Sequence, residues 1–83
     1  MVEDNVERVK ALVLIRTDPM AEKNMLKKLL SFEGVTEAHF IYGPYDEYCI
    51  IDCPSYDALN ELVMNKIRGL EGIKSTTTCY LAD

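Results

Sequence analysis

Four strand-like and two helix-like segments alternate along this chain, and their order constrains the fold more than any other sequence feature. Residues 7–16, 35–42, 47–53 and 73–81 alternate in side-chain character or are rich in β-branched residues, which predicts strands. Apolar residues three and four positions apart predict one helix between the first two strands and another between the last two. The predicted order is therefore strand, helix, strand, strand, helix, strand.

This order is that of the ferredoxin-like βαββαβ unit. It predicts an α+β sandwich in which four antiparallel strands form one sheet, in the order 4-1-3-2, with both helices on one face. A repeated joint supports two similar halves, because FEGV at residues 32–35 recurs as LEGI at residues 70–73, each where a helix leads into a strand. The 83 residues are expected to form a single domain over residues 1–83.

Local signals place the ends of the predicted helices. Asp18 stands before Pro19, which predicts Asp18 as the N-cap of the first helix, and Gly34 is expected to end that helix in a left-handed conformation. Pro54 and Ser55 are expected to end the third strand and to cap the second helix. The second helix should bury four apolar residues: Leu59, Leu62, Val63 and Ile67.

The charge balance argues against several function classes. Lys and Arg total 9 against 14 Asp and Glu, which gives a net charge of −5. Sequence-independent nucleic-acid binding and polybasic membrane anchoring both need a basic surface. No apolar run approaches the ~20 residues of a membrane span, and the polar start MVEDNVERVK lacks a signal peptide's apolar core. We expect a cytoplasmic protein without direct contact with nucleic acid or membrane.

The cysteines do not form a plausible disulfide or metal framework. Cys49 and Cys53 share a predicted strand at ~13 Å separation, and a disulfide needs Cα atoms within ~7 Å. Cys79 lies two strands away, and His39 is the sole histidine. We therefore interpret the cysteines as small buried hydrophobes, and we expect no metal and no cofactor.

The sheet's second face predicts a partner. Both faces of the first strand are apolar at its centre. In the third strand, Cys49 and Ile51 lie on one face, and Tyr48 and Ile50 lie on the other. Two helices cover only one face of such a sheet, so the other face is left apolar and uncovered. We expect a two-fold homodimer with sheets packed face to face. The alternative is a monomer whose sheet meets water.

Two groups of residues could bind a small polar molecule. In the turn at residues 42–46, Gly43 lets a ligand approach the backbone, turn N–H groups can hold a carboxylate, and Asp46 can hold an ammonium group. The alternative is an ordinary hairpin turn in which Asp46 bonds its own backbone. In the last strand, Thr76 and Thr78 point to one face and could hydrogen-bond the same molecule, although threonine runs also simply suit strands.

Taken together, ALVLIRTDP, FEGVTEAHFIYGPYDEY and LNELVMNKIRGLEGIKSTTT resemble a known family over nearly the whole chain. The chain resembles the effector-binding C-terminal domain of the Lrp/AsnC transcription regulators, also called the RAM domain. This resemblance implies a non-enzymatic domain, dimers joined through their sheets and, often, octameric rings of four dimers. It implies an amino acid effector bound between neighbouring dimers.

The resemblance also assigns residues. The glycine and aspartate of the family's hairpin turn correspond to Gly43 and Asp46, with Tyr45 beside them. The polar residues that an adjoining dimer contributes correspond best to Thr76 and Thr78. An effector bound at such a shared site would couple ligand occupancy to assembly.

One departure from the family changes the expected function. Full-length members carry an N-terminal helix-turn-helix unit of about 50 residues, whereas about eight residues precede the first strand here. The chain therefore resembles a stand-alone RAM protein, an amino acid sensor that would act through a DNA-binding paralogue. One alternative is a small cofactor-free enzyme of the dimeric α/β-barrel type, using His39, Asp52 and tyrosines in a pocket beneath the helices. Another is a structural oligomer that has lost ligand binding.

Overall fold

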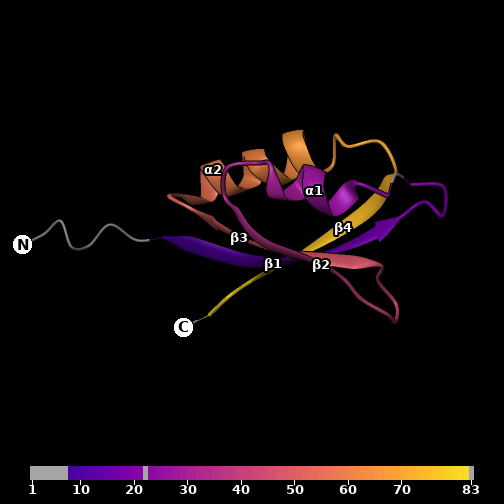
Figure 1. Ribbon diagram of the computed structural model, residues 1–83. Coiled ribbons are helices and arrows are strands. Elements are labelled where there is room, and N and C mark those ends of the chain that lie inside the picture. Colours follow the sequence, from indigo (N-terminus) through magenta and orange to yellow (C-terminus); the bar gives the residue numbers. More distant parts are fainter. Residues whose placement is uncertain (1–7, 22, 83) are drawn as a thin grey trace, which may run out of the picture.

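The computed structural model describes residues 8–21 and 23–82. Its elements follow the predicted order, and two helical segments lie across one face of a single sheet (Figure 1). No helix in the described residues is long and apolar enough to cross a membrane. The elements are β1 (Val9–Thr17), α1 (Met25–Leu30), β2 (Val35–Phe40), β3 (Glu47–Cys53), α2 (Tyr56–Glu61), the π-helix η2 (Leu62–Ile67) that continues it, and β4 (Ile73–Tyr80).

The four strands form one antiparallel sheet in the order β2-β3-β1-β4. This confirms the predicted ferredoxin-like fold and strand order. Residue 7, which was the predicted start of the first strand, lies outside the described residues. At the centre of the sheet, Val13 of β1 lies opposite Cys49 of β3 and Thr78 of β4. Directly opposed residues share a face, so this register fixes which side chains meet the helices.

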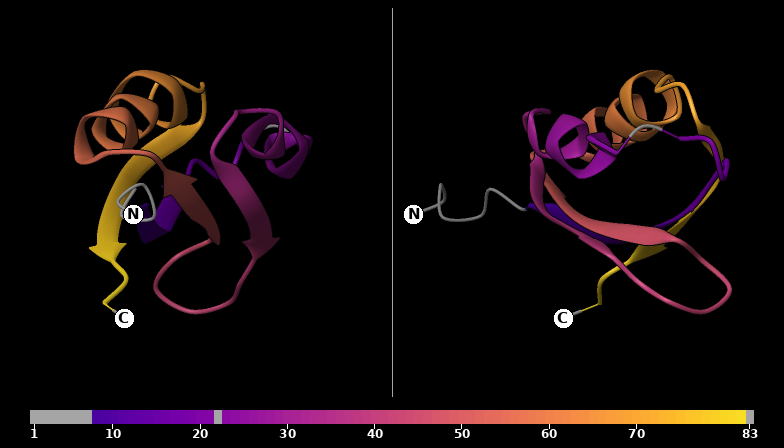
Figure 2. Two further views of the ribbon diagram at one scale, coloured as in Figure 1. Left: turned by 90° about the vertical axis from the view of Figure 1, so that its left-hand side faces the viewer. Right: turned by 45° about the vertical axis from the view of Figure 1, so that its right-hand side comes forward.

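The core lies between the sheet and the helices. Alternate residues of β1 and β3 are buried on this face, and the helices close it from above (Figure 2). The four residues predicted to be buried by the second helix are all at most 5% exposed. The central buried side chains are Ala11, Val13, Ile15, Met25, Leu29, Cys49, Ile51, Leu59 and Ile67.

The start of the first helix differs from the prediction. Helix α1 begins at Met25, so Asp18 is not its N-cap. Instead, the Asp18 carboxylate accepts a 2.9 Å hydrogen bond from the Met20 N–H, and the Asp18 C=O accepts one from Ala21. Asp18 therefore closes a local turn, because its short carboxylate reaches the backbone two residues on.

The structure agrees more closely with the other two predicted helix signals, Ser55 and Gly34. The Ser55 hydroxyl accepts a 3.1 Å hydrogen bond from the Ala58 N–H, which confirms the N-cap of α2. Gly34 has the predicted left-handed backbone, with φ +104°, but it follows α1 by four residues and leads into β2. The Gly34 carbonyl accepts a 2.8 Å bond from the Asp52 N–H, so this glycine joins the turn to the end of β3.

No helix of the described residues lies on the second face of the sheet (Figure 2). Leu12, Leu14, Tyr48 and Ile50 form its centre and are only partly buried in the single chain. Lys10 and Arg16 lie farther along β1 on the same face and are exposed. We call this surface the open face. Its apolar centre fits the predicted sheet-to-sheet dimer, which remains a prediction.

The three cysteines are free thiols. Cys49 and Cys53 are buried beneath the helices, which confirms the prediction for those two. For Cys79 the prediction was wrong: it is exposed on the edge strand β4, opposite Leu12 on the open face. Burial, with a smaller contribution from Glu47, raises the pKa of the Cys49 thiol to about 12. Cys49 is therefore a neutral core residue at physiological pH.

Candidate functional site

The turn between β2 and β3 presents an open stretch of backbone. The Ile41 N–H donates a 3.0 Å hydrogen bond to the Asp46 carbonyl and closes the base of the loop. Gly43 has φ +122°, and a Cβ built there would find no atom within 4 Å. Tyr42 beside it is fully exposed. A ligand can therefore approach the peptide groups around Gly43 without meeting a side chain at that position.

Asp46 is anchored to the end of β1. Its Oδ2 accepts a 2.8 Å hydrogen bond from the Thr17 N–H, and its own N–H donates a 2.9 Å bond to the Ile15 carbonyl. The alternative prediction, in which Asp46 bonds the backbone of its own turn with its side chain, was wrong. The β1–β4 register shifts between Arg16 and Thr17. At this irregularity the Asp46 carboxylate accepts the hydrogen bond from the Thr17 N–H.

The second carboxylate oxygen of Asp46 has no hydrogen-bond partner in residues 8–21 and 23–82. Asp46 is exposed, so this oxygen can be reached from solvent. A carboxylate that is held by one oxygen and open at the other is suited to accept a charge-assisted hydrogen bond from an ammonium group. Thr17 completes this arrangement, and no sequence pattern pointed to it.

Tyr45 reaches across the end of the sheet to β4. Its Oη lies 3.5 Å from the Oγ1 of Thr77, which is a long hydrogen bond. Thr77 is exposed and lies opposite Leu14 on the open face. The alternation of the threonine run explains why the neighbour of Tyr45 is Thr77 and not either flanking threonine.

Thr76 and Thr78 lie on the other side of the sheet. They are opposite Ile15 and Val13, on the face that the helices cover, and both are partly buried. Within one chain, the structure therefore joins Tyr45 and Asp46 to Thr77 and Thr17, and it does not join them to Thr76 or Thr78. A contribution of Thr76 and Thr78 from an adjoining copy remains a prediction.

Glu47, the first residue of β3, is an unexpected buried acid beside this turn. It is 2% exposed, and its Oε1 has no hydrogen-bond partner in the described part of the chain. It lies opposite Ile15 and Phe40 on the helix-covered face. Burial raises the pKa of the Glu47 carboxyl, and the neighbouring Asp46 charge raises it further. The alternation of β3 puts Glu47 on the same face as Cys49 and Ile51, but it does not show that the carboxylate lacks a partner.

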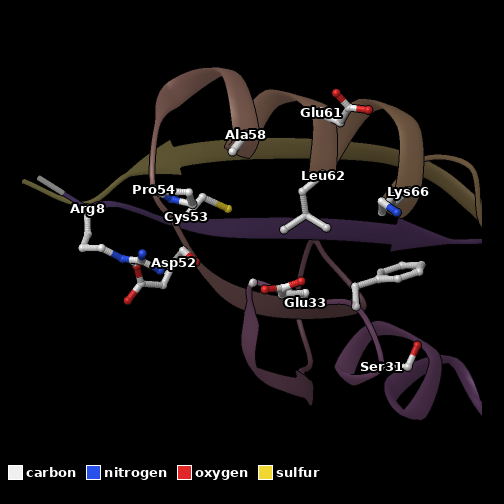
Figure 3. Close-up of a pocket in the computed structure, with 12 residues that line it drawn as sticks. Arg8, Ser31, Glu33, Asp52, Cys53, Pro54, Ala58, Glu61, Leu62 and Lys66 are labelled. Carbon is white, nitrogen blue, oxygen red and sulfur yellow. Dashed lines mark hydrogen bonds and ion pairs between the residues drawn. The ribbon is translucent and has the colours of Figure 1, made fainter. Parts of the chain in front are cut away.

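A groove of about 640 Å³ lies at the opposite end of the sheet, between the end of α1 and the second helix (Figure 3). His39 does not line it. Instead, His39 is exposed and contacts Glu37, with Nε2 and Oε1 3.3 Å apart, and the ring of Tyr48. Of the acid–base residues named for the enzyme alternative, Asp52 lines this groove and His39 does not. No cluster of metal-ligating side chains occurs among the described residues.

The model of the Lrp/AsnC ligand binding domain matches residues 10–82. The chain belongs to this family. The regulatory protein AsnC of Escherichia coli K12 is 42% identical to this Lrp/AsnC domain over 53 residues, which are 64% of the chain and 35% of AsnC. The domain thus matches only about a third of the length of that curated relative.

Solved structures agree with this assignment. The crystal structure of FFRP-DM1 superposes on the Lrp/AsnC domain with a TM-score of 0.83 at 30% identity, over 89% of this chain and 99% of that one. A Neisseria meningitidis transcriptional regulator, solved as a complex with L-Met, gives a TM-score of 0.77. It covers 98% of this chain and 53% of that one, and at 10% identity the likeness concerns the fold alone.

Proposed function

We propose that this Lrp/AsnC domain is a non-enzymatic amino acid sensor that couples effector binding to oligomerisation. The observation that carries the proposal is the fixed carboxylate of Asp46, held by the Thr17 N–H through one oxygen and open at the other. It stands beside the unobstructed backbone of Gly43. An α-amino acid needs both an acceptor for its ammonium group and N–H donors for its carboxylate.

The effector lies, in this proposal, between two copies of the domain. Asp46 accepts the ammonium group, turn N–H groups near Gly43 hold the carboxylate, and Tyr45 lines the site. Within one chain, Thr76 and Thr78 do not reach these groups, so an adjoining copy supplies them. A ligand that binds only the assembled form favours that form by mass action.

The assembly unit is a homodimer that buries the open face, with four dimers forming an octameric ring when the effector is bound. The partly exposed Leu12, Leu14, Tyr48 and Ile50 supply an apolar centre for the dimer interface. Lys10 and Asp52 lie opposite each other at one end of this face. Across a two-fold axis, Lys10 of one copy can pair with Asp52 of the other.

The domain reaches DNA, in this proposal, through a DNA-binding paralogue in the cytoplasm. The net charge of −5 disfavours direct contact with phosphates. The relatives named above support a regulatory role. A paralogue of the same fold could join the oligomer through equivalent sheet and turn contacts.

A thermal-shift screen against the twenty common amino acids tests the proposal. An effector at 100 times its dissociation constant should stabilise the domain by about 2.7 kcal/mol. Asp46→Asn keeps an acceptor for the Thr17 N–H but removes the charge, so it should abolish the shift and retain the fold. No shift with any amino acid at millimolar concentration would favour the structural-oligomer alternative instead.

A further inference from the structure

The groove between the helices is separate from the turn at residues 42–46. It is bordered by the start of β1, the end of β3 and the residues between α1 and β2, whereas the turn precedes the start of β3. The seven residues of β3 put the two regions about 20 Å apart. Its volume of about 640 Å³ falls in the range of small-molecule sites.

The groove has an apolar floor and an ion pair at one end. Cys53, Ala58 and Leu62 line it between the helices (Figure 3). At one end, the Arg8 Nε donates a 2.9 Å hydrogen bond to Asp52 Oδ1, which forms an ion pair. This pair neutralises the charges at that end. A bound molecule therefore meets methyl and thiol groups below it and a neutral ion pair at one end.

Three further charged residues line the groove. Glu33 lies on the segment before β2, while Glu61 and Lys66 lie on the helix opposite (Figure 3). None of the three makes an ion pair or a side-chain hydrogen bond within residues 8–21 and 23–82. The groove thus offers two carboxylates from opposite walls and one ammonium group.

The π-helix η2 explains how Glu61 and Lys66 come to line the same groove. In an α-helix, residues five apart lie about 140° apart around the axis and point to different sides. Here the Arg68 N–H donates a 2.9 Å hydrogen bond to the Val63 carbonyl, five residues earlier, and residues Leu62–Ile67 are π-helical. This wider turn brings Lys66 to the groove. π-helical turns are rare and are often found at functional sites.

We propose that this groove binds a small zwitterion whose ammonium and carboxylate groups are separated by an aliphatic chain, such as an ω-amino acid. The ammonium group lies between Glu33 and Glu61, the chain covers Leu62 and Cys53, and the carboxylate meets Lys66. Glu61 and Lys66 are five residues apart, which is at most about 7.5 Å along a helix axis, and an extended six-carbon chain separates its charged ends by about the same distance. An α-amino acid carries both charges on one carbon and does not match this spacing.

Titration of 6-aminohexanoate into the ¹⁵N-labelled protein, followed by amide chemical shifts, tests the proposal. We expect saturable shifts at Glu33, Leu62 and Lys66 and none at residues 42–46, with a millimolar dissociation constant. Hexylamine and hexanoate each lack one charge and should bind about tenfold more weakly. The absence of saturable shifts up to about 20 mM, or equal binding of either single-charge compound, would overturn the proposal.

Variants at the charged residues complete the test. Lys66→Gln and Glu61→Gln should each weaken binding of 6-aminohexanoate about three- to tenfold. Both residues are exposed, so the variants are expected to keep the fold, which the same spectra verify. Lys74→Gln, on exposed β4 and outside the groove, is the matched control and should leave the affinity unchanged. Unchanged affinity in both groove variants would also contradict the proposal.

Discussion

The Asp46 carboxylate accepts a 2.8 Å hydrogen bond from the backbone N–H of Thr17, and this bond ties the β2–β3 turn to the end of β1. It holds the acid in place before any ligand arrives, so little ordering is needed at that side chain on binding. The same bond gives Asp46 two separable roles. One oxygen accepts the bond from the Thr17 N–H, and in the proposed function the other accepts a hydrogen bond from the effector's ammonium group.

Two substitutions of Asp46 should separate these roles. Asp46→Ala removes the acceptor for the Thr17 N–H and should lower the free energy of unfolding by about 1 kcal/mol, with complete loss of amino acid binding. Asp46→Asn should unfold at nearly the wild-type urea concentration and still fail to bind. Equal destabilisation by both variants would show that the charge, and not the hydrogen bond, holds the turn.

Glu47 should make stability fall as pH rises. Its folded-state pKa lies above the ordinary 4.5, because of burial first and the Asp46 charge second. Between these two values the folded chain keeps a proton that the unfolded chain has released, so the free energy of unfolding decreases with pH across that window. Urea unfolding at a series of pH values and fixed protein concentration measures this slope.

Glu47→Gln should flatten that part of the pH profile, since the amide does not titrate. Glu47→Leu should raise the free energy of unfolding at neutral pH by about 1–2 kcal/mol, because it also removes the unpartnered buried oxygen. Glu71→Gln, at an exposed acid in the loop before β4, is the matched control and should leave the slope intact. An unchanged slope in Glu47→Gln would assign the pH dependence to other groups.

Gly34 should tolerate a side chain far less well than Gly43. Both have positive φ, but a Cβ at Gly34 would lie 3.0 Å from Leu62 Cδ2 and 3.3 Å from Cys53 Sγ, whereas a Cβ at Gly43 meets nothing within 4 Å. Gly34→Ala should cost about 2–3 kcal/mol in unfolding free energy, and Gly43→Ala about 1. Thermal unfolding of the two variants gives the comparison. Equal losses of unfolding free energy would mean that the side chains around Leu62 move to make room for the new Cβ.

Cys79 should report on the proposed dimer interface. It lies opposite Leu12 on the open face, so a sheet-to-sheet dimer would shield it. Leu12→Asp places a charge at the centre of that face and should yield monomers, in which one thiol per chain reacts rapidly with a disulfide reagent. In the wild-type dimer the reaction should be at least about tenfold slower. Rapid reaction of one thiol in a wild-type dimer would place the interface elsewhere.

Much of the fold was predictable because each strand and helix of this two-layer domain buries one face, which leaves a period-two or helical pattern of apolar residues in the sequence. The bounds of β3 and the buried face of the second helix follow from alternation and from apolar spacing. The predicted start of α1 was wrong because an acidic residue followed by Pro is typical both of a helix N-cap and of a local turn. The sequence does not decide between them.

The candidate site was predictable only in part, because its contacts join distant segments. The turn at residues 42–46 was visible as a cluster of turn residues, but the bond from Thr17 to Asp46 depends on a register irregularity in β1. The inward Glu47 and the groove beside η2 likewise arise from packing between elements. No local motif encodes those relationships.

Light scattering with and without amino acids tests the central claim most directly. The account predicts dimers without effector and a shift toward octamers with at least one amino acid, at the same protein concentration. It also predicts that Asp46→Asn remains dimeric in both conditions. An effector-independent mass, or an amino acid response that survives in Asp46→Asn, would contradict it.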